Sequence, residues 1–237
     1  MSADALRFIH ASDFRLGQPI QGLRYIPTEW RDRLRDAPYE ATANVFNTAV
    51  TENVDFILLS GDLIDMRQSS PFAVKFLLDQ FASLKTAGIP IYWISGEMDK
   101  RSYWSKGITL PENVILFGSS GIESRQSQSN DGFQYTIVGS SFDGERSINT
   151  SMFAGFGDVS QTTIAACYGD VEIGDEQSNM VYWACGGLDE GRRIEFGSVE
   201  INYTGTPQPR KSTSSSSGCV LVSISNDNVV VTSDMSV

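Results

Sequence analysis

Histidine is almost absent from this chain, which has a single one, His10, in 237 residues. Cysteine is also scarce. The three cysteines form no CxxC pair, and their odd number fits buried free thiols in a reducing compartment better than a disulfide framework. They are Cys167, Cys185 and Cys219. A zinc site built from cysteine and histidine ligands is therefore not expected.

Long apolar runs and a basic surplus are missing as well. No apolar segment approaches the roughly 20 residues that a membrane helix needs. The start of the chain, 1–7, lacks the basic stretch and apolar run of a signal peptide. We therefore expect a soluble, cytoplasmic protein with no membrane partner. Lys and Arg total 18 against 29 Asp and Glu, a net charge of −11, so DNA binding is not supported by charge.

The hydrophobic content of 41% is enough for one α/β domain, and we expect a single domain over 1–237. Apolar runs predict strands at 6–11, 54–60 and 89–95. Helices are expected between them at 39–53, with Pro38 just ahead, and at 70–88. Such alternation of strands and helices indicates a mostly parallel sheet.

The second half of the chain is expected to consist mainly of short strands. The predicted strands are 114–117, 135–139, 163–168, 180–185 and 199–203. A Ser-rich linker is expected at 212–217, followed by a C-terminal hairpin over 218–233. The arginines at 31, 33 and 35 are interleaved with Asp32 and Asp36, which favours a solvated segment that leads into the first helix, with a local basic patch as the alternative.

Acidic turns follow three successive predicted strands. They are Ser12-Asp13, Gly61-Asp62 with Asp65 beyond it, and Gly96-Glu97-Met98-Asp99. In a parallel sheet these turns share the carboxyl edge, where open α/β folds bind ligands. Converging carboxylates repel one another unless a cation, an arginine or raised pKa values offset the charge. We therefore expect a shared site at this edge, with Asp65 and Asp99 shaping its loops.

Five segments fit one family pattern. They are 8–17 (FIHASDFRLG), 54–65 (VDFILLSGDLID), 88–91 with 96–99, 182–189 (YWACGGLD) and 203–210 (YTGTPQPR). Together they resemble calcineurin-like metallophosphoesterases, and most closely the SbcD-like nuclease subunits of DNA double-strand-break repair. The second segment is the most specific. The resemblance implies a four-layer α/β/β/α sandwich of two mixed sheets flanked by helices.

The resemblance also implies a two-metal phosphoesterase site, in which bridged divalent cations activate water. Asp13 matches a metal-ligating aspartate and Asp62 the bridging one. The other positions have changed. Those that the family fills with ligand or catalytic side chains are here Arg15, Glu97, Met98, Tyr168, Gly187 and Asp189, with Met98 in the place of the catalytic histidine. Every aligned histidine is lost, so the resemblance implies a pseudoenzyme with no catalytic residue of its own.

Two arrangements would balance the charges of this remnant site. In the preferred one, Arg15 folds into the site and pairs with carboxylates in place of a metal, so that no cofactor is needed. In the other, Asp13, Asp62, Glu97 and Asp189 hold one Mg²⁺, Mn²⁺ or Ca²⁺ ion. His10 is interpreted as a strand histidine hydrogen-bonded beneath the site, with the role of a replacement ligand as the alternative. Tyr168 is expected to be buried with its hydroxyl bonded.

Three functions follow from these observations. The first is a catalytically inactive scaffold or binding subunit, for which the resemblance implies a large coiled-coil ATPase as partner and pairing with a second copy. The second is a residual phosphoesterase that uses one hard divalent cation. The third is a binding module that holds a phosphate or nucleotide with Arg15 and backbone N–H groups.

Overall fold

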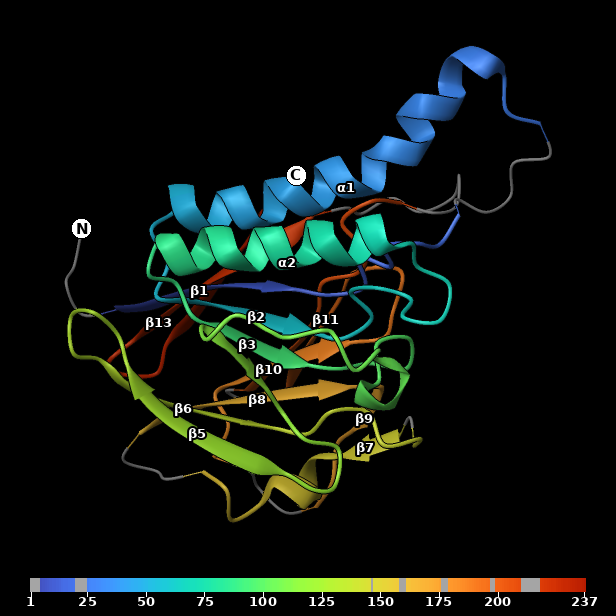
Figure 1. The fold of residues 1–237 in the computed structure, drawn as a ribbon. Coiled ribbons are helices and arrows are strands. Elements are labelled where there is room, and N and C mark those ends of the chain that lie inside the picture. Colours follow the sequence, from blue (N-terminus) through green and yellow to red (C-terminus); the bar gives the residue numbers. More distant parts are fainter. Residues whose placement is uncertain are drawn as a thin grey trace.

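The structure is a computed structural model that describes residues 5–19, 25–145, 147–157, 161–175, 179–196, 199–209 and 218–237. Two six-stranded mixed sheets face each other, and two α-helices lie together on the outer face of the first (Figure 1). This confirms the predicted α/β class with two mixed sheets. The Ser-rich segment 212–217 lies outside the described residues. No helix in the described ranges is long and apolar enough to span a membrane.

The first sheet has the order β14-β13-β1-β2-β3-β4. Its strands are β1 (Ala5–Ala11), β2 (Phe56–Ser60), β3 (Ile91–Ile94), β4 (Val114–Leu116), β13 (Cys219–Ser225) and β14 (Val230–Met235). Strands β1 to β4 are parallel, and β13 and β14 form an antiparallel pair beside β1. The carboxyl ends of four strands therefore lie along one edge.

The second sheet also has six strands, in the order β11-β12-β10-β8-β6-β5. Its strands are β5 (Glu123–Gln128), β6 (Gln134–Gly139), β8 (Thr162–Tyr168), β10 (Tyr182–Gly186), β11 (Arg192–Phe196) and β12 (Val199–Tyr203). The four inner strands are parallel, and the two edge strands are antiparallel to their neighbours. The outer face of this sheet packs on η2 (Thr150–Phe153) and on the small sheet of β7 (Ser147–Asn149) and β9 (Asp170–Glu172).

Side-chain alternation along β1 separates two hydrophobic cores. Phe8 and its neighbours on the same face pack between the two sheets, whereas Ile9 and Ala11 pack against the helices. His10 has the same parity as Phe8, so the pleat directs the only histidine into the layer between the sheets. Its burial there follows from its place in the strand.

The helices α1 (Thr28–Thr51) and α2 (Pro71–Thr86) cover the first sheet. Helix α2 begins as predicted, with Ser70 accepting a bond of 3.3 Å from the Ala73 N–H and Pro71 at the first position. The predicted start of the first helix at residue 39 was wrong, because the helix already begins at Thr28 and contains Pro38. Proline sets a helical φ, and here it lies within the helix rather than at its start.

Gly186, the last residue of β10 in the second sheet, lies against the end of β2 in the first. A Cβ atom at this position would collide with the Ser60 carbonyl oxygen at the end of β2. Gly186→Ala is therefore expected to lower the free energy of unfolding by about 3 kcal/mol, as overpacking does when backbone must move. Urea denaturation measures this, with Gly107→Ala as the control, because an added Cβ there meets no atom within 4 Å. Equal losses in both variants would contradict this account of the sheet contact.

Candidate functional site

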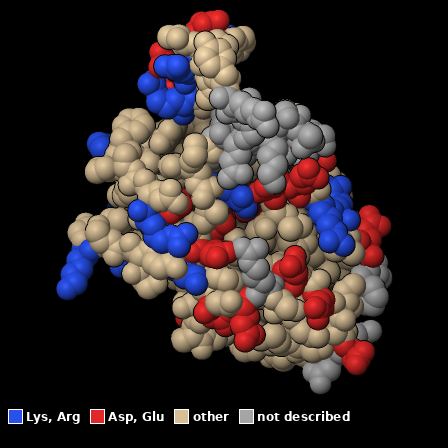
Figure 2. Space-filling model, turned by 90° about the vertical axis from the view of Figure 1, so that its right-hand side faces the viewer, with Lys and Arg blue, Asp and Glu red and all other residues tan. Residues whose placement is uncertain are grey.

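Turns from both sheets converge at the carboxyl edge of the strands. The Gly187 N–H, after β10, donates to Asp13 Oδ2 at 2.9 Å, and the Tyr168 hydroxyl, at the end of β8, donates to Asp62 Oδ2 at 2.7 Å. These bonds join the second sheet to the turns after β1 and β2. An open hollow of about 670 Å³ lies over them, lined by Arg15, Asp62, Met98, Tyr168, Gly187, Leu188, Asp189, Glu190, Gly191 and Arg192. Acidic and basic side chains alternate on this face of the molecule (Figure 2).

Asp13 is fully buried at the centre of the site. Its Oδ2 accepts from the Ser12 hydroxyl at 2.7 Å and from the Gly187 N–H, while its Oδ1 accepts from Arg15 at 3.0 Å. Burial raises the pKa of Asp13 to about 7, and the charge of Arg15 acts in the opposite direction. The carboxylate is thus costly to bury, and its three donors, one of which is the cation Arg15, offset that cost.

Arg15 lies inside the site. Its guanidinium forms ion pairs with Asp13 and with Asp189, and its side chain is 15% exposed. Arg15 has a φ of 51°, the left-handed region that arginine rarely adopts. Asp13 and Asp62 share this conformation, with φ values of 56° and 52°. Such strained residues persist where the surrounding structure over-determines them and gather at functional sites.

Asp62 is almost fully buried and is held by two donors. The Met98 N–H donates to its Oδ1 at 2.9 Å, and the Tyr168 hydroxyl donates to its Oδ2. Burial raises the pKa of Asp62, these two bonds and Arg15 lower it, and the charge of Glu97 raises it further. Glu97 is half-buried in the turn after β3 and acts on Asp62 through its charge.

Two further aspartates hold the loops in place. Asp99 accepts from the Leu63 N–H at 2.8 Å and from the Gly96 N–H at 2.5 Å, which ties the turn after β3 to the turn after β2. Asp65 accepts from the Arg67 N–H at 3.0 Å and from Gln68 and Gln18 side chains. Both contacts match the loop-shaping role predicted for these residues.

His10 lies one layer beneath the site. Its Nδ1 is 3.0 Å from the Tyr182 hydroxyl and its Nε2 is 2.8 Å from the Ser60 hydroxyl, so both ring nitrogens have partners. Burial lowers the pKa of His10 to about 3, which keeps the imidazole neutral. This is the placement expected of a strand histidine. Sequence reasoning missed the partners Ser60 and Tyr182, although the matching parity of β1 and β2 could have indicated the first.

The structure brings six of the seven predicted site residues to this edge: Asp13, Arg15, Asp62, Glu97, Tyr168 and Asp189. Sequence reasoning missed Ser12 and the Gly187 N–H as donors to Asp13. It also missed Thr204, whose hydroxyl is 2.9 Å from the Ser12 hydroxyl. The available signals were Ser12 directly before Asp13 and the pair Gly186-Gly187 at the end of β10. Neither signal reveals which atom the residue will contact.

The donor set does not fit a two-metal centre. The oxygens of Asp13 and Asp62 already accept bonds from Arg15, Ser12, Gly187, Met98 and Tyr168. A guanidinium occupies the space beside Asp13 and Asp189, and it brings positive charge of its own. Within the described ranges, no set of three or more His, Cys, Asp or Glu side chains is arranged to hold a metal ion.

Residues 6–179 match the model of the family described as calcineurin-like phosphoesterase. The chain is 38% identical over 115 residues to the uncharacterized metallophosphoesterase YhaO of Bacillus subtilis, which covers 48% of this chain and 28% of that protein. It is 28% identical over 110 residues to the DNA double-strand break repair protein Mre11 of Saccharolobus solfataricus, covering 46% and 26%. The matched part thus spans little more than a quarter of either relative.

Solved structures share the fold at low identity. A dimetal phosphatase from Danio rerio superposes with a TM-score of 0.55 at 10% identity, covering 98% of this chain and 99% of the other. GAP50, the anchor in the inner membrane complex of Plasmodium, gives 0.53 at 14% identity, covering 98% and 85%. These similarities concern the fold alone.

Proposed function

The chain belongs to the calcineurin-like phosphoesterase family, and we propose that it is a non-catalytic member that serves as a scaffold or binding subunit. The observation that carries this proposal is the position of Arg15, paired with Asp13 and Asp189 in the middle of the acidic turns. The arginine supplies the positive charge that these carboxylates need. The fold can therefore keep its acidic turns without a bound cation.

Electrostatics support this replacement. Two unit charges 4 Å apart interact by about 4 kcal/mol at an effective dielectric constant of 20, and a divalent ion doubles that figure. A metal ion beside Asp13 would be repelled by Arg15 on this scale, or would have to displace its guanidinium from two carboxylates. It would also compete with the Ser12 and Gly187 donors that already fill Asp13 Oδ2.

The general acid is missing too. Met98, at the family's catalytic histidine position, has a thioether that carries no exchangeable proton. Its backbone N–H is bonded to Asp62. The one imidazole of the chain, His10, is buried and bonded through both nitrogens. A leaving group in the hollow would find no histidine to protonate it.

Calorimetric titration of Mn²⁺ and of Mg²⁺ into chelator-treated protein tests the proposal. We expect no saturable binding, and we expect bis-p-nitrophenyl phosphate to be hydrolysed no faster than in protein-free buffer with either metal. Asp62→Ala is the matched control, because it removes the aspartate at the family's bridging position. Binding of one equivalent of metal that Asp62→Ala abolishes would contradict the proposal and favour the alternative, a residual phosphoesterase with one hard cation.

A phosphate-binding or nucleotide-binding role of the same hollow is less well supported. Arg15 is committed to two carboxylates. Arg192 adds one positive charge to the lining, but Asp62, Asp189 and Glu190 line the same space, so an added anion would meet more negative than positive charge there. Thermal stabilisation by millimolar nucleotide without turnover would favour that role over the scaffold.

The nature of the partner belongs to the proposal as well. We infer a place in the SbcD-like branch, with a coiled-coil ATPase subunit or a second copy of this chain as the binding partner, in a cytoplasmic setting. The similarity to the Saccharolobus repair protein supports this choice over part of the chain. The net charge of −11 argues against DNA as the direct ligand. A strictly monomeric protein that retains no partner in pull-downs from native extract would count against the scaffold.

A further inference from the structure

The first ten residues of α1, 28–37, project beyond α2 and the sheet (Figure 1). We call this segment the arm. The buried residues of α1 begin only at Pro38, and the arm has none. Pro27, at its N-cap, makes no side-chain cap bond. Short helices without a packed face are marginal in water, so the arm depends on the packed half of α1 or on an added contact.

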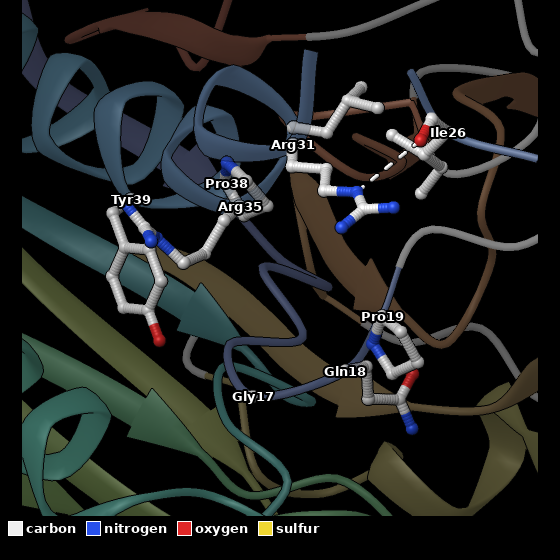
Figure 3. Close-up of a pocket in the computed structure, with 9 residues that line it drawn as sticks. Gly17, Gln18, Pro19, Ile26, Arg31, Arg35, Pro38 and Tyr39 are labelled. Carbon is white, nitrogen blue, oxygen red and sulfur yellow. Dashed lines mark hydrogen bonds between the residues drawn. The ribbon is translucent and has the colours of Figure 1, made fainter. Parts of the chain in front are cut away.

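A groove of about 360 Å³ lies between the arm and the segment that follows β1. It is lined by Gly17, Gln18, Pro19, Ile26, Arg31, Leu34, Arg35, Pro38 and Tyr39. Leu34, Pro38 and Tyr39 supply apolar lining from the helix. Pro38 and Tyr39 lie on the helix side of the groove, and Pro19 lies on the facing segment (Figure 3). Two exposed aromatic side chains lie on the two helices, Trp30 in the arm and Phe72 at the start of α2. Trp30 is 49% exposed, and Phe72, which contacts Tyr39, is 66% exposed.

The two arginines of the groove differ in their partners. Arg35 is paired with Asp32 and Asp36. Arg31 makes one weak bond, from its Nε to the Ile26 carbonyl at 3.4 Å, and among the described residues it forms no ion pair. Its guanidinium extends from the helix into the groove (Figure 3). Its two terminal nitrogens present the fork that binds a carboxylate through two parallel bonds.

We propose that this groove binds a peptide segment of a partner protein in which a carboxylate stands next to an apolar side chain. The carboxylate pairs with Arg31, and the apolar side chain packs on Leu34, Pro38 and Tyr39. Charge complementarity selects this ligand. Arg35 is already paired, whereas Arg31 forms no ion pair among the described residues, so a carboxylate is the complementary charge for its guanidinium. The volume suits one or two side chains, at the low end of ordinary ligand pockets.

This inference goes beyond the proposed scaffold role by naming the chemistry of a partner. The groove includes none of the residues that line the hollow at the carboxyl edge. Metal binding or hydrolysis at Asp62 would therefore refute the proposed function and leave the groove untouched. Failure of the groove to bind peptide would leave the proposed function standing.

Selection of a phage-displayed library of random dodecapeptides on the full chain tests the proposal. We expect enriched peptides to share an Asp or Glu beside Leu, Ile, Phe or Trp. Fluorescence anisotropy of one such synthetic peptide should then show about a tenfold loss of affinity in Arg31→Glu, the scale of one lost charge-assisted contact. Arg33→Glu is the matched control. It makes the same charge change on the same arm, at a residue that stacks on Trp30 and does not line the groove.

Circular dichroism of both variants checks that their helix content equals that of the wild type. The proposal would be overturned if Arg31→Glu bound the peptide as tightly as the wild type, or if Arg31→Glu and Arg33→Glu lost affinity equally. Enrichment of basic or purely apolar peptides would also overturn it. So would a wild-type dimer in sedimentation equilibrium that Leu34→Glu dissociates, because the groove would then hold a second copy.

Discussion

Arg15→Met is expected to lower the free energy of unfolding by about 3–5 kcal/mol at pH 8.5, the range found when one partner of a buried ion pair is removed. The substitution keeps an unbranched side chain about as long as the aliphatic part of arginine, and it removes the guanidinium and its charge. Asp13, fully buried, then faces Asp62 with no cation between them. In the wild type Asp13 is ionised at this pH, since its pKa is about 7. Arg15 lowers that pKa, so in Arg15→Met it rises further, and the variant must either hold an unpaired buried charge or take up a proton. Urea denaturation followed by circular dichroism measures the loss.

Two companion measurements assign the loss to the charge. In Asp13→Asn with Arg15→Met, the amide oxygen can still accept from Ser12 and Gly187, and both charges are gone. We expect this double variant to recover most of the stability that Arg15→Met loses, which is strong coupling in a double-mutant cycle. We also expect millimolar Mg²⁺ to stabilise Arg15→Met but not the wild type. Arg15 would not stand in for a cation if the losses of unfolding free energy in the two single variants simply add in the double variant. The same would follow if Mg²⁺ stabilised the wild type as much as it stabilises Arg15→Met.

Much of the fold follows from local pattern. The continuous apolar run before Gly61-Asp62 predicted a strand, and β2 is a strand buried on both faces. Parallel strands place their carboxyl ends together, and this is why Asp13, Asp62 and the Gly96–Asp99 turn could be assigned to one edge from sequence. The second sheet brings Tyr168 and Asp189 to the same edge, and its placement came from the family resemblance.

The parts of the fold and of the site that the sequence did not predict depend on contacts that no local pattern encodes. Pro38 is an ordinary helix-start signal, but the packing of Ala41, Val45 and Ala49 on the sheet supports a helix that runs on through it from Thr28. Strand β5, ESRQSQ, is a mostly polar edge strand specified by its pairing with β6, so its sequence shows no strand pattern. Whether Arg15 would pair with Asp13 or face solvent was likewise a matter of backbone conformation, since its φ of 51° directs the side chain inward.

The second large expected effect is on the pH dependence of the free energy of unfolding, and it comes from His10, the single histidine. In the folded protein burial lowers the pKa of His10 to about 3, against 6.5 for an ordinary histidine. Below pH 6.5 the unfolded chain therefore binds a proton that the folded chain refuses, and stability falls as the pH falls. One pKa unit corresponds to about 1.4 kcal/mol, so His10 should remove about 2 kcal/mol by pH 5 and about 4 kcal/mol by pH 3.5. The buried carboxyls Asp13 and Asp99, with pKa values raised by burial, contribute with the opposite sign.

The comparison with His10→Gln isolates the histidine term, because glutamine can bond to Ser60 and Tyr182 and does not titrate. We expect the wild type to lose about 2 kcal/mol more than the variant between pH 7.5 and pH 5, whatever the difference in their absolute stabilities. Since the chain has one histidine, a single imidazole resonance reports on it in NMR spectra. That resonance should stay constant from pH 8 to pH 5 in the folded protein. A titration midpoint near pH 6.5 would show that His10 is in contact with solvent. Its alternative role as a replacement ligand in the site above it would then be favoured again.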